Sequence, residues 1–315
     1  MTDTSKIKRG LNTDYNSAEY HGLSGTYSSS QLKTLLKDPE LFHKEYILKT
    51  EAKKSIPAFD IGTFYHTAVL EPELLDEECA VFTGIRRGAK WEDFKKENDG
   101  KAIITLTEKK QADTLIKATF ASEIAMDYIA KGTPEISAFV DLTVSGGVIF
   151  SKSIIDGEVY YMDRKDGWIA SGMKELPKGN VLTVKVRADI FGDEKFILDL
   201  KSTTGNPKDA HAIKAKISSY GYDLSTSLYL DIFTMASGRL YDTFIWTFAS
   251  KDMGTCKNWI ASRNNVLVGR AKWMKAVVEL VKWIDKDWVF SETIEELEPN
   301  FFEKEWLNVK EEDEL

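Results

Sequence analysis

The chain has 315 residues, 43% of them hydrophobic and 11% aromatic, which excludes a chain that is disordered throughout and predicts a large buried core. No apolar run approaches the roughly 18 residues of a membrane span, and the N-terminus lacks the apolar stretch of a signal peptide. We therefore expect a cytoplasmic protein with no membrane partner. The net charge of −8 argues against a generally basic protein that coats nucleic acid.

This net charge is concentrated in residues 289–315, which hold ten acidic residues against two lysines. The other 288 residues balance 40 basic against 40 acidic side chains, and such a neutral body can still carry a basic cleft. We interpret 289–315 as a solvated acidic tail, 28–288 as one domain with a helical N-terminal part, and 1–27 as a loosely ordered segment.

The first predicted elements are helices. A capped helix begins after Ser28 and ends at Asp38-Pro39, and a second short helix should follow directly. After a polar linker, the sequence FDIGTFYHTAVLEP has helical spacing and places Gly62 and His66 on one face, four residues apart. A histidine in such a place is ordinarily a packed helix residue.

Residues 84–101 are basic, contain glycine and lack periodicity, so we expect a loop. Its residues Arg86, Arg87, Lys90 and Trp91 suit contact with a DNA phosphate and stacking on a base, although a solvated charged loop is the plainer interpretation. Lys53 and Lys54 leave the same two alternatives open. Next, the sequence from LTEKK to IAKG predicts one long helix that opens near Thr107.

The pattern changes near residue 133. Alternating apolar and polar residues, interrupted by glycine turns, predict a meander of antiparallel strands up to about residue 186. Two further strands, a helix over 220–235, the strand FIWTFAS and a helix over 258–283 complete the order. Four of the eight tryptophans and both cysteines are expected in the interior, the cysteines reduced and too few for a metal–thiolate site: Trp246, Trp259, Trp273, Trp283, Cys79 and Cys256.

The segment VRADIFGDEKFILDLK carries the chemistry. Asp199 and Lys201 lie two residues apart on a strand and share a face. In a short hairpin, paired residue numbers would sum to about 388, which sets Asp189 opposite Asp199. Two carboxylates about 4 Å apart repel by about 4 kcal/mol at an effective dielectric near 20, so a cation is expected between them.

Mg²⁺, with Mn²⁺ as a substitute, suits this predicted pair of carboxylates. Lys201 beside it can orient or deprotonate a water, and this set of groups performs phosphodiester hydrolysis. Taken alone, however, D-x-K at a strand end is more often a surface ion pair. The surrounding hairpin, with an aspartate ten residues upstream and a helix after it, is what favours catalysis.

Several segments in order resemble the RecE-like (exonuclease VIII type) phage exonucleases of the PD-(D/E)xK nuclease superfamily, relatives of the lambda-type exonucleases. The resemblance runs from about Tyr20 to Met235 and includes YHGLSGTYSSSQLKTLLKDPELF, IGTFYHTAVLEPE, VRAD, ILDLKSTT and GYDLSTSLYLD. It implies an α/β (α+β) fold, with a restriction-endonuclease-like core and a mixed central sheet flanked by helices.

The resemblance also implies roles for individual residues. His66, Asp189, Asp199 and the backbone carbonyl of Leu200 would be metal ligands, and Lys201 would be the catalytic lysine. Glu135 matches a family position whose role is less defined. Relatives carry Gln three residues after the tyrosine of the following helix, whereas here Ser225 follows Tyr222, and this difference bears on water or substrate positioning.

The implied activity is Mg²⁺-dependent 5′→3′ digestion of double-stranded DNA from an end, which leaves 3′ single strands for recombination. The implied partners are double-stranded DNA ends, further copies of the chain in a ring, and a single-strand annealing protein. The implied setting is a bacterial cell, with phage or prophage origin. Two alternatives stay open: an endonuclease or single-strand nuclease of the same fold, and a DNA-binding relative with little or no turnover.

Overall fold

The computed structural model describes residues 4–51 and 57–291. The predicted acidic tail beyond residue 291 and the pair Lys53 and Lys54 lie outside the described residues.

Within the described residues, ten strands form one mixed sheet, in which β12-β11-β10-β9-β5-β6-β7-β8 are neighbours in that order. Short β1 adds to β5, short β2 adds to β9, and β3 and β4 pair separately. The strands are β1 (Gly10–Asn12), β2 (Thr26–Tyr27), β3 (Cys79–Phe82), β4 (Ala102–Thr105), β5 (Gly132–Ser145), β6 (Val148–Lys152), β7 (Val159–Asp163), β8 (Gly167–Ala170), β9 (Asn180–Gly192), β10 (Phe196–Thr203), β11 (Thr243–Ser250) and β12 (Cys256–Ile260).

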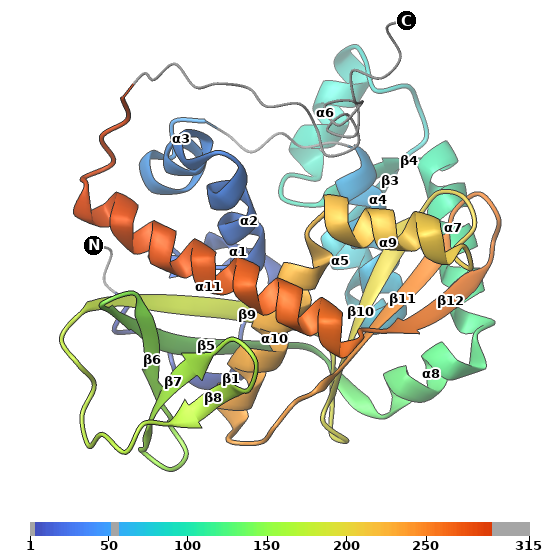
Figure 1. The fold of residues 1–315 in the computed structure, drawn as a ribbon. Coiled ribbons are helices and arrows are strands. Elements are labelled where there is room, and N and C mark those ends of the chain that lie inside the picture. Colours follow the sequence, from blue (N-terminus) through green and yellow to red (C-terminus); the bar gives the residue numbers. More distant parts are fainter. Residues whose placement is uncertain (1–3, 52–56, 292–315) are drawn as a thin grey trace, which may run out of the picture.

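Helices surround this sheet (Figure 1). Two of them are short and irregular, a π-helix at His43–Leu48 and a 3₁₀ turn at Pro72–Leu74. The α-helices are α1 (Ser17–Gly22), α2 (Ser29–Lys37), α3 (Pro39–Phe42), α4 (Pro57–Leu70), α5 (Leu75–Glu78), α6 (Ala89–Glu97), α7 (Leu106–Phe120), α8 (Glu123–Ala130), α9 (Ala210–Ser219), α10 (Tyr222–Ser237) and α11 (Arg263–Asp285).

The sheet has a hydrophobic core on each face, because successive strand residues point to opposite sides. On one face, α2, α10 and α11 pack against residues such as Ile197. On the other face, α4 and α7 pack against Leu198 and Leu200. Figure 1 shows α11 crossing one side of the sheet, with α4 and α7 beside the strands β10 and β11. The centre of the sheet is therefore held from both sides.

Several predicted elements are confirmed. The helix over FDIGTFYHTAVL is α4, which ends just before Glu71 and Pro72. The meander is β5 to β8, joined by antiparallel pairing. Strands β9 and β10 pair Phe191 with Ile197 and Ile190 with Leu198, which is the predicted register sum of 388.

The prediction of a loop over 84–101 was wrong for the middle of this segment, where the structure has the helix α6. The predicted long helix is two helices. Thr105, rather than Thr107, caps α7 by accepting a hydrogen bond from the Glu108 backbone N–H, and Ser122 caps α8. The helical periodicity continues through Ser122, but the Ser122 side chain caps a new helix and so divides the segment in two.

Two other segments differ from expectation. The helix predicted from residue 258 begins at Arg263, after the cap Ser262, because Trp259 pairs with Trp246 in an edge strand. The segment expected to be loose at 1–27 is built into the fold from residue 4, since β1 and β2 join the sheet. Arg9 holds it there with a 2.8 Å hydrogen bond to Asp141.

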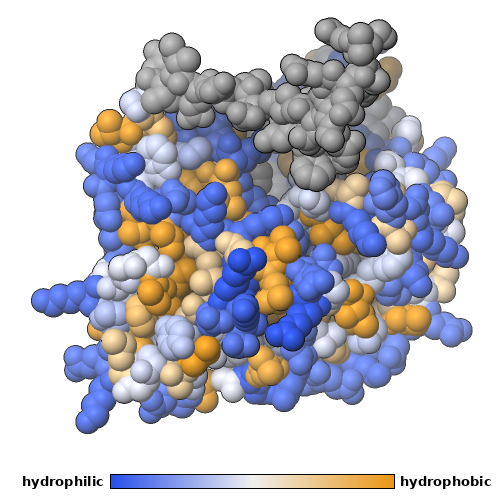
Figure 2. Space-filling model, in the orientation of Figure 1, coloured by the Kyte–Doolittle hydropathy of each residue, from blue (hydrophilic) through white to orange (hydrophobic). Residues whose placement is uncertain are grey.

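The predicted interior residues follow expectation closely. Trp246 and Trp273 are buried, and Trp259 and Trp283 are half-buried against the same core. Both cysteines are free thiols, Cys79 buried and Cys256 half-buried. Figure 2 shows a face that is largely hydrophilic, with separate apolar patches. Among the described helices, none combines the length and the apolar character that crossing a bilayer requires.

Candidate active site

A cavity of about 750 Å³ opens between α4, α10 and the central strands. Its wall includes His66 from α4, Glu135 from β5, Asp189 from β9, and Asp199 and Lys201 from β10. The five side chains come from four elements. Strands β9 and β10 follow each other in sequence, whereas α4 and β5 are distant, so the packing of α4 and the pairing of β5 with β9 bring the five together.

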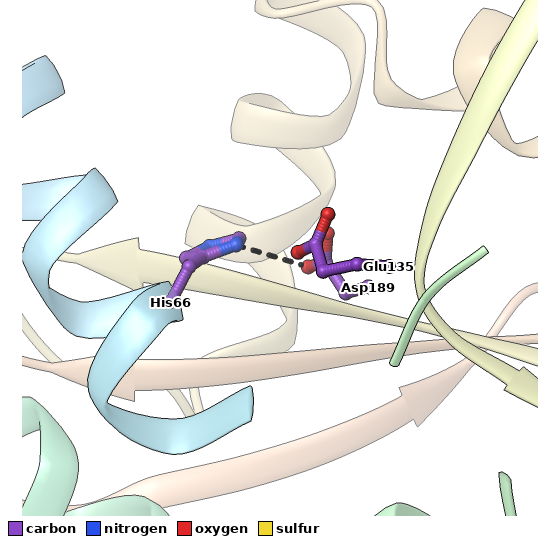
Figure 3. Close-up of side chains that lie close together, drawn as sticks. All are labelled: His66, Glu135 and Asp189. Atoms are coloured by element: carbon purple, nitrogen blue, oxygen red, sulfur yellow. Dashed lines mark ion pairs between the residues drawn. The ribbon is translucent and has the colours of Figure 1, made fainter. Parts of the chain in front are cut away.

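His66, Glu135 and Asp189 lie close together in the cavity wall (Figure 3). One ligand-type atom from each of the three lies within 4.8 Å of the others. The His66 ring points from α4 toward the two carboxylates, and its Nδ1 lies 3.4 Å from Asp189 Oδ2. Such a convergence of imidazole and carboxylates is a donor set for a divalent cation.

Glu135 faces Asp189 because of the register between β5 and β9. The pairs Pro134–Ile190 and Ile136–Ala188 bracket these two residues on neighbouring strands. Glu135 has φ of +55°, a left-handed conformation that is uncommon for a residue with a side chain and that concentrates at functional sites.

The Glu135 carboxylate is under electrostatic strain. Burial and the nearby Asp189 carboxylate raise the pKa of Glu135 to about 7. The Arg187 guanidinium, which donates a hydrogen bond to Glu135 and another of 2.7 Å to the Tyr15 carbonyl, opposes this effect. Two crowded carboxylates of this kind favour a bound cation.

Asp189 is held ionised by its surroundings. Burial works against its charge, but His66, Lys201 and a hydrogen bond of 2.6 Å from the Leu200 backbone N–H hold the pKa of Asp189 below its ordinary value. The same hydrogen bond fixes the carboxylate at the point where the β9–β10 ladder ends.

Asp199 is paired with Lys201, the residue with which it was predicted to share a strand face. Its Oδ2 lies 2.6 Å from Lys201 Nζ, and the side chains are 11% and 21% exposed. Among the described residues, the candidate metal-ligand group contains Glu135 in addition to His66 and Asp189, and not Asp199. The two aspartates therefore belong to one cavity: Asp189 lies with His66 and Glu135, and Asp199 forms the ion pair with Lys201.

Lys201 carries a positive charge in this arrangement. Burial works to lower its pKa, but the carboxylates of Asp199 and Asp189 hold the pKa of Lys201 above its ordinary value. Its ammonium also lies 3.4 Å from the Leu200 carbonyl and 5.2 Å from the centre of the Tyr222 ring. A protonated Lys201 is a hydrogen-bond donor, so it suits orientation and charge stabilisation rather than removal of a proton.

The remaining predicted site residues divide into two groups. Tyr222 and Leu200 line the cavity, whereas Ser225 is not among its lining residues. Arg86 is also outside the lining, where it donates to Glu108 at 2.8 Å and to the Ile103 carbonyl at 2.6 Å. Its neighbours in the predicted DNA-contacting set are likewise not on the cavity wall: Arg87, Lys90 and Trp91.

Sequence reasoning missed several residues of the cavity, among them Arg187, Lys216, Tyr229 and Lys251. Arg187 was visible only as a polar position on β9, and its partner Glu135 is 52 residues away. Tyr229 lies seven residues after Tyr222 on α10, which places the two on one helix face, and that spacing is the signal that would have found it.

No protein-family model matches the chain, and a comparison with curated proteins finds no relative. Among solved structures, the chain is similar to a Eubacterium rectale protein described as a "Putative exonuclease", with 14% identity and a TM-score of 0.55. That match covers 95% of this chain and 100% of the other. A second structure, of SSO0001, has a TM-score of 0.26 at 13% identity and covers 71% of this chain and 88% of that one, too weak to carry an argument. The chain thus shares its overall fold with the first of these proteins.

Proposed function

We propose that the protein is a metal-dependent nuclease that hydrolyses DNA phosphodiester bonds in this cavity. The observation that carries the proposal is the convergence of His66, Glu135 and Asp189 within 4.8 Å, beside the charged pair of Asp199 and Lys201. The description of the structural neighbour as an exonuclease agrees with it.

The donor set fits a divalent cation. Oxygen ligands from Glu135 and Asp189 with one imidazole nitrogen suit Mg²⁺, and Mn²⁺ suits the imidazole better. The Leu200 carbonyl and Asp199 are proposed to complete the ligands on the β10 side. When bound, the ion would polarise the phosphate and lower the pKa of a water molecule.

The protein's own groups position the reacting groups and stabilise the charge that develops on the phosphate. The Leu200 N–H holds the Asp189 carboxylate, and Asp199 holds the Lys201 ammonium. Lys201 would then donate to a phosphate oxygen or to the attacking water and offset the negative charge that develops there. Charged donors fixed in a buried site act more strongly than the same groups in water.

The finer assignment rests on the resemblance in sequence. We propose that the fold is the PD-(D/E)xK core, with Asp189 and the segment DLK of β10 as its motif. The activity would be 5′→3′ digestion of double-stranded DNA from an end, by a ring of several copies that works with a single-strand annealing protein.

The test is incubation with linear duplex DNA labelled at the 5′ or the 3′ end, in Mg²⁺ or in EDTA. The proposal predicts early release of the 5′ label in Mg²⁺, retention of the 3′ label until late, and no release in EDTA. The Asp189→Asn variant should be inactive, whereas Asp76→Asn, at an exposed position outside the cavity lining, should match the wild type.

A covalently closed circle separates the alternatives. An exonuclease leaves it intact, and cleavage of the circle would replace the proposed activity by that of an endonuclease. Digestion of a free single strand without digestion of duplex would favour a single-strand nuclease. DNA binding without any cleavage in Mg²⁺ or Mn²⁺ would favour a DNA-binding relative.

A further inference from the structure

The cavity has a second surface, formed by aromatic and basic side chains rather than by carboxylates. Tyr220 and Tyr222 line it together with Lys216 and Lys251. The rings of the two tyrosines are stacked, with centroids 5.5 Å apart and planes 21° from parallel. Tyr220 is 61% exposed, so much of this residue is accessible to solvent.

The local backbone builds this stack. Tyr220 is the C-cap residue that follows α9, Tyr222 begins α10, and Gly221 between them has φ of +59°. That left-handed turn, which glycine adopts without strain, brings alternate side chains onto one side of the junction. A Cβ on Gly221 would also lie 3.4 Å from Lys33.

Positive charge surrounds the stack. Lys33 and Lys201 lie 5.5 Å and 5.2 Å from the centre of the Tyr222 ring. Lys216 donates to Thr203 Oγ1 and, at 3.2 Å, to the Thr204 carbonyl, both neutral acceptors. With the described residues, none of Lys33, Lys216 and Lys251 forms an ion pair within 4.0 Å. Lys216 and Lys251, which line the cavity, are therefore available to an anion, whereas burial lowers the pKa of Lys33 to about 8.

We propose that the Tyr220–Tyr222 stack is a platform on which an unpaired DNA base rests, with Lys216 and Lys251 holding the adjacent phosphates. Aromatic rings interleaved with lysines are the usual surface for single strands, because every base has a stacking face and every nucleotide a phosphate. This inference rests on the proposed function and names its substrate more narrowly: the strand that enters the cavity is unpaired there.

The geometry supports base stacking on the tyrosines next to cleavage at the metal-ligand residues. Tyr222 stacks on Tyr220 and also lies 5.2 Å from the Lys201 ammonium, in the same cavity as the metal-ligand trio. A strand stacked on Tyr220 would therefore extend toward the residues that would cleave it. An intact duplex offers its bases stacked on one another and cannot place one on Tyr220 without unpairing it.

Binding without catalysis tests the platform. A short single strand that carries 2-aminopurine is titrated with the full-length protein in EDTA, and stacking is read from quenching of the fluorescent base. We expect quenching with the wild type, and with Tyr220→Leu a loss of affinity of about tenfold together with most of the quenching. Tyr220→Phe should behave as the wild type does.

Phe120→Leu is the matched control, because Phe120 is an aromatic residue of 48% exposure that is not among the cavity residues. Its binding should equal that of the wild type. Both positions are exposed, so the melting temperatures of the two leucine variants should stay close to that of the wild type. Equal affinity and quenching by Tyr220→Leu, or no binding of the single strand by the wild type, would overturn the platform.

The two proposals can fail separately. If the wild type cleaves DNA but Tyr220→Leu binds and cleaves as well as it does, the platform alone falls. If single strands stack on Tyr220 but no DNA is cleaved in Mg²⁺ or Mn²⁺, the nuclease alone falls. If both hold, Tyr220→Leu should raise KM for a duplex with a frayed end by about tenfold and leave kcat within about twofold.

Discussion

At the scale of single residues, Lys201 shows how the neighbouring charges in the cavity determine the protonation state of a side chain. An isolated buried lysine loses its proton readily, yet two carboxylates hold this one in its charged form. Removing the amine would leave the buried Asp199 with an uncompensated charge. The positive charge of Lys201 therefore serves both catalysis and the stability of the site.

Lys201→Ala should reduce DNA cleavage by about 10²- to 10³-fold or more, the cost of losing one positioned donor to a developing charge. Binding of Mn²⁺ should persist, because the trio of ligands remains. Single-turnover cleavage rates measure the first effect and a metal titration the second. Lys282→Ala, which changes an exposed lysine on α11, is the control, and cleavage by Lys201→Ala at its rate would remove Lys201 from the mechanism.

Lys185 is a buried lysine that has no carboxylate partner among the residues that the structure describes. It donates to the Tyr20 carbonyl at 2.6 Å and lies 4.6 Å from the centre of the Tyr20 ring, and burial lowers the pKa of Lys185 to about 8. Below pH 8 the folded protein carries the full cost of this buried charge. Above pH 8 the folded state releases the proton while the unfolded state keeps it to about pH 10.5, so the cost disappears.

The wild type should therefore gain stability over Lys185→Met as the pH rises from 8 to 9.5, by roughly 1 to 2 kcal/mol. Urea unfolding of both proteins across this range measures the difference. A constant difference between pH 7 and 9.5 would show that Lys185 does not titrate there.

At the scale of elements, the crossing of α10 and α11 sets the position of the tyrosines on α10. Gly269 of α11 lies so close to α10 that a Cβ there would be 1.9 Å from the Asp223 carbonyl oxygen. Asp231 of α10 accepts hydrogen bonds from Arg270 at 2.7 and 2.9 Å and from Trp273 at 3.0 Å. A buried charge pair thus lies next to the closest approach of the helices.

Gly269→Ala should destabilise the fold by about 2 to 3 kcal/mol, because the helices must separate to admit the methyl group. Gly62→Ala on α4 is the matched change, since among the described residues outside its own helix turn no atom lies within 4 Å of a Cβ placed there. It should be neutral or stabilise by about 0.5 to 1 kcal/mol. Denaturant unfolding of the pair decides the point, and equal stabilities would mean that the crossing is not tightly packed.

Sequence predicted elements best where the determinants are local. The alternation through β9 and β10 and the turn between them were sufficient for the register that brings Ile190 against Leu198. The same reasoning failed at residues 258–260, where strand pairing with β11 replaces helix, because a cross-strand partner cannot be read from one segment. Capping by Ser122 was a local signal that helical periodicity obscured.

At the scale of the whole molecule, the site depends on contacts between distant segments. Asp189, Asp199 and Lys201 were predictable because they lie within one hairpin. The place of Glu135 opposite Asp189 follows from the β5–β9 register, and that of His66 from the packing of α4, neither of which the sequence pattern specifies. The ion pair between Asp199 and Lys201 follows from the strand face that the two residues were predicted to share.

The binding of a divalent cation by His66, Glu135 and Asp189 is the claim on which the rest depends, and titration of the protein with Mn²⁺, followed by electron paramagnetic resonance, tests it most directly. We expect tight binding by the wild type, a loss of about tenfold or more in affinity for Asp189→Asn and for Glu135→Gln, and no change for Asp76→Asn. Equal Mn²⁺ affinity in all four proteins would contradict the account.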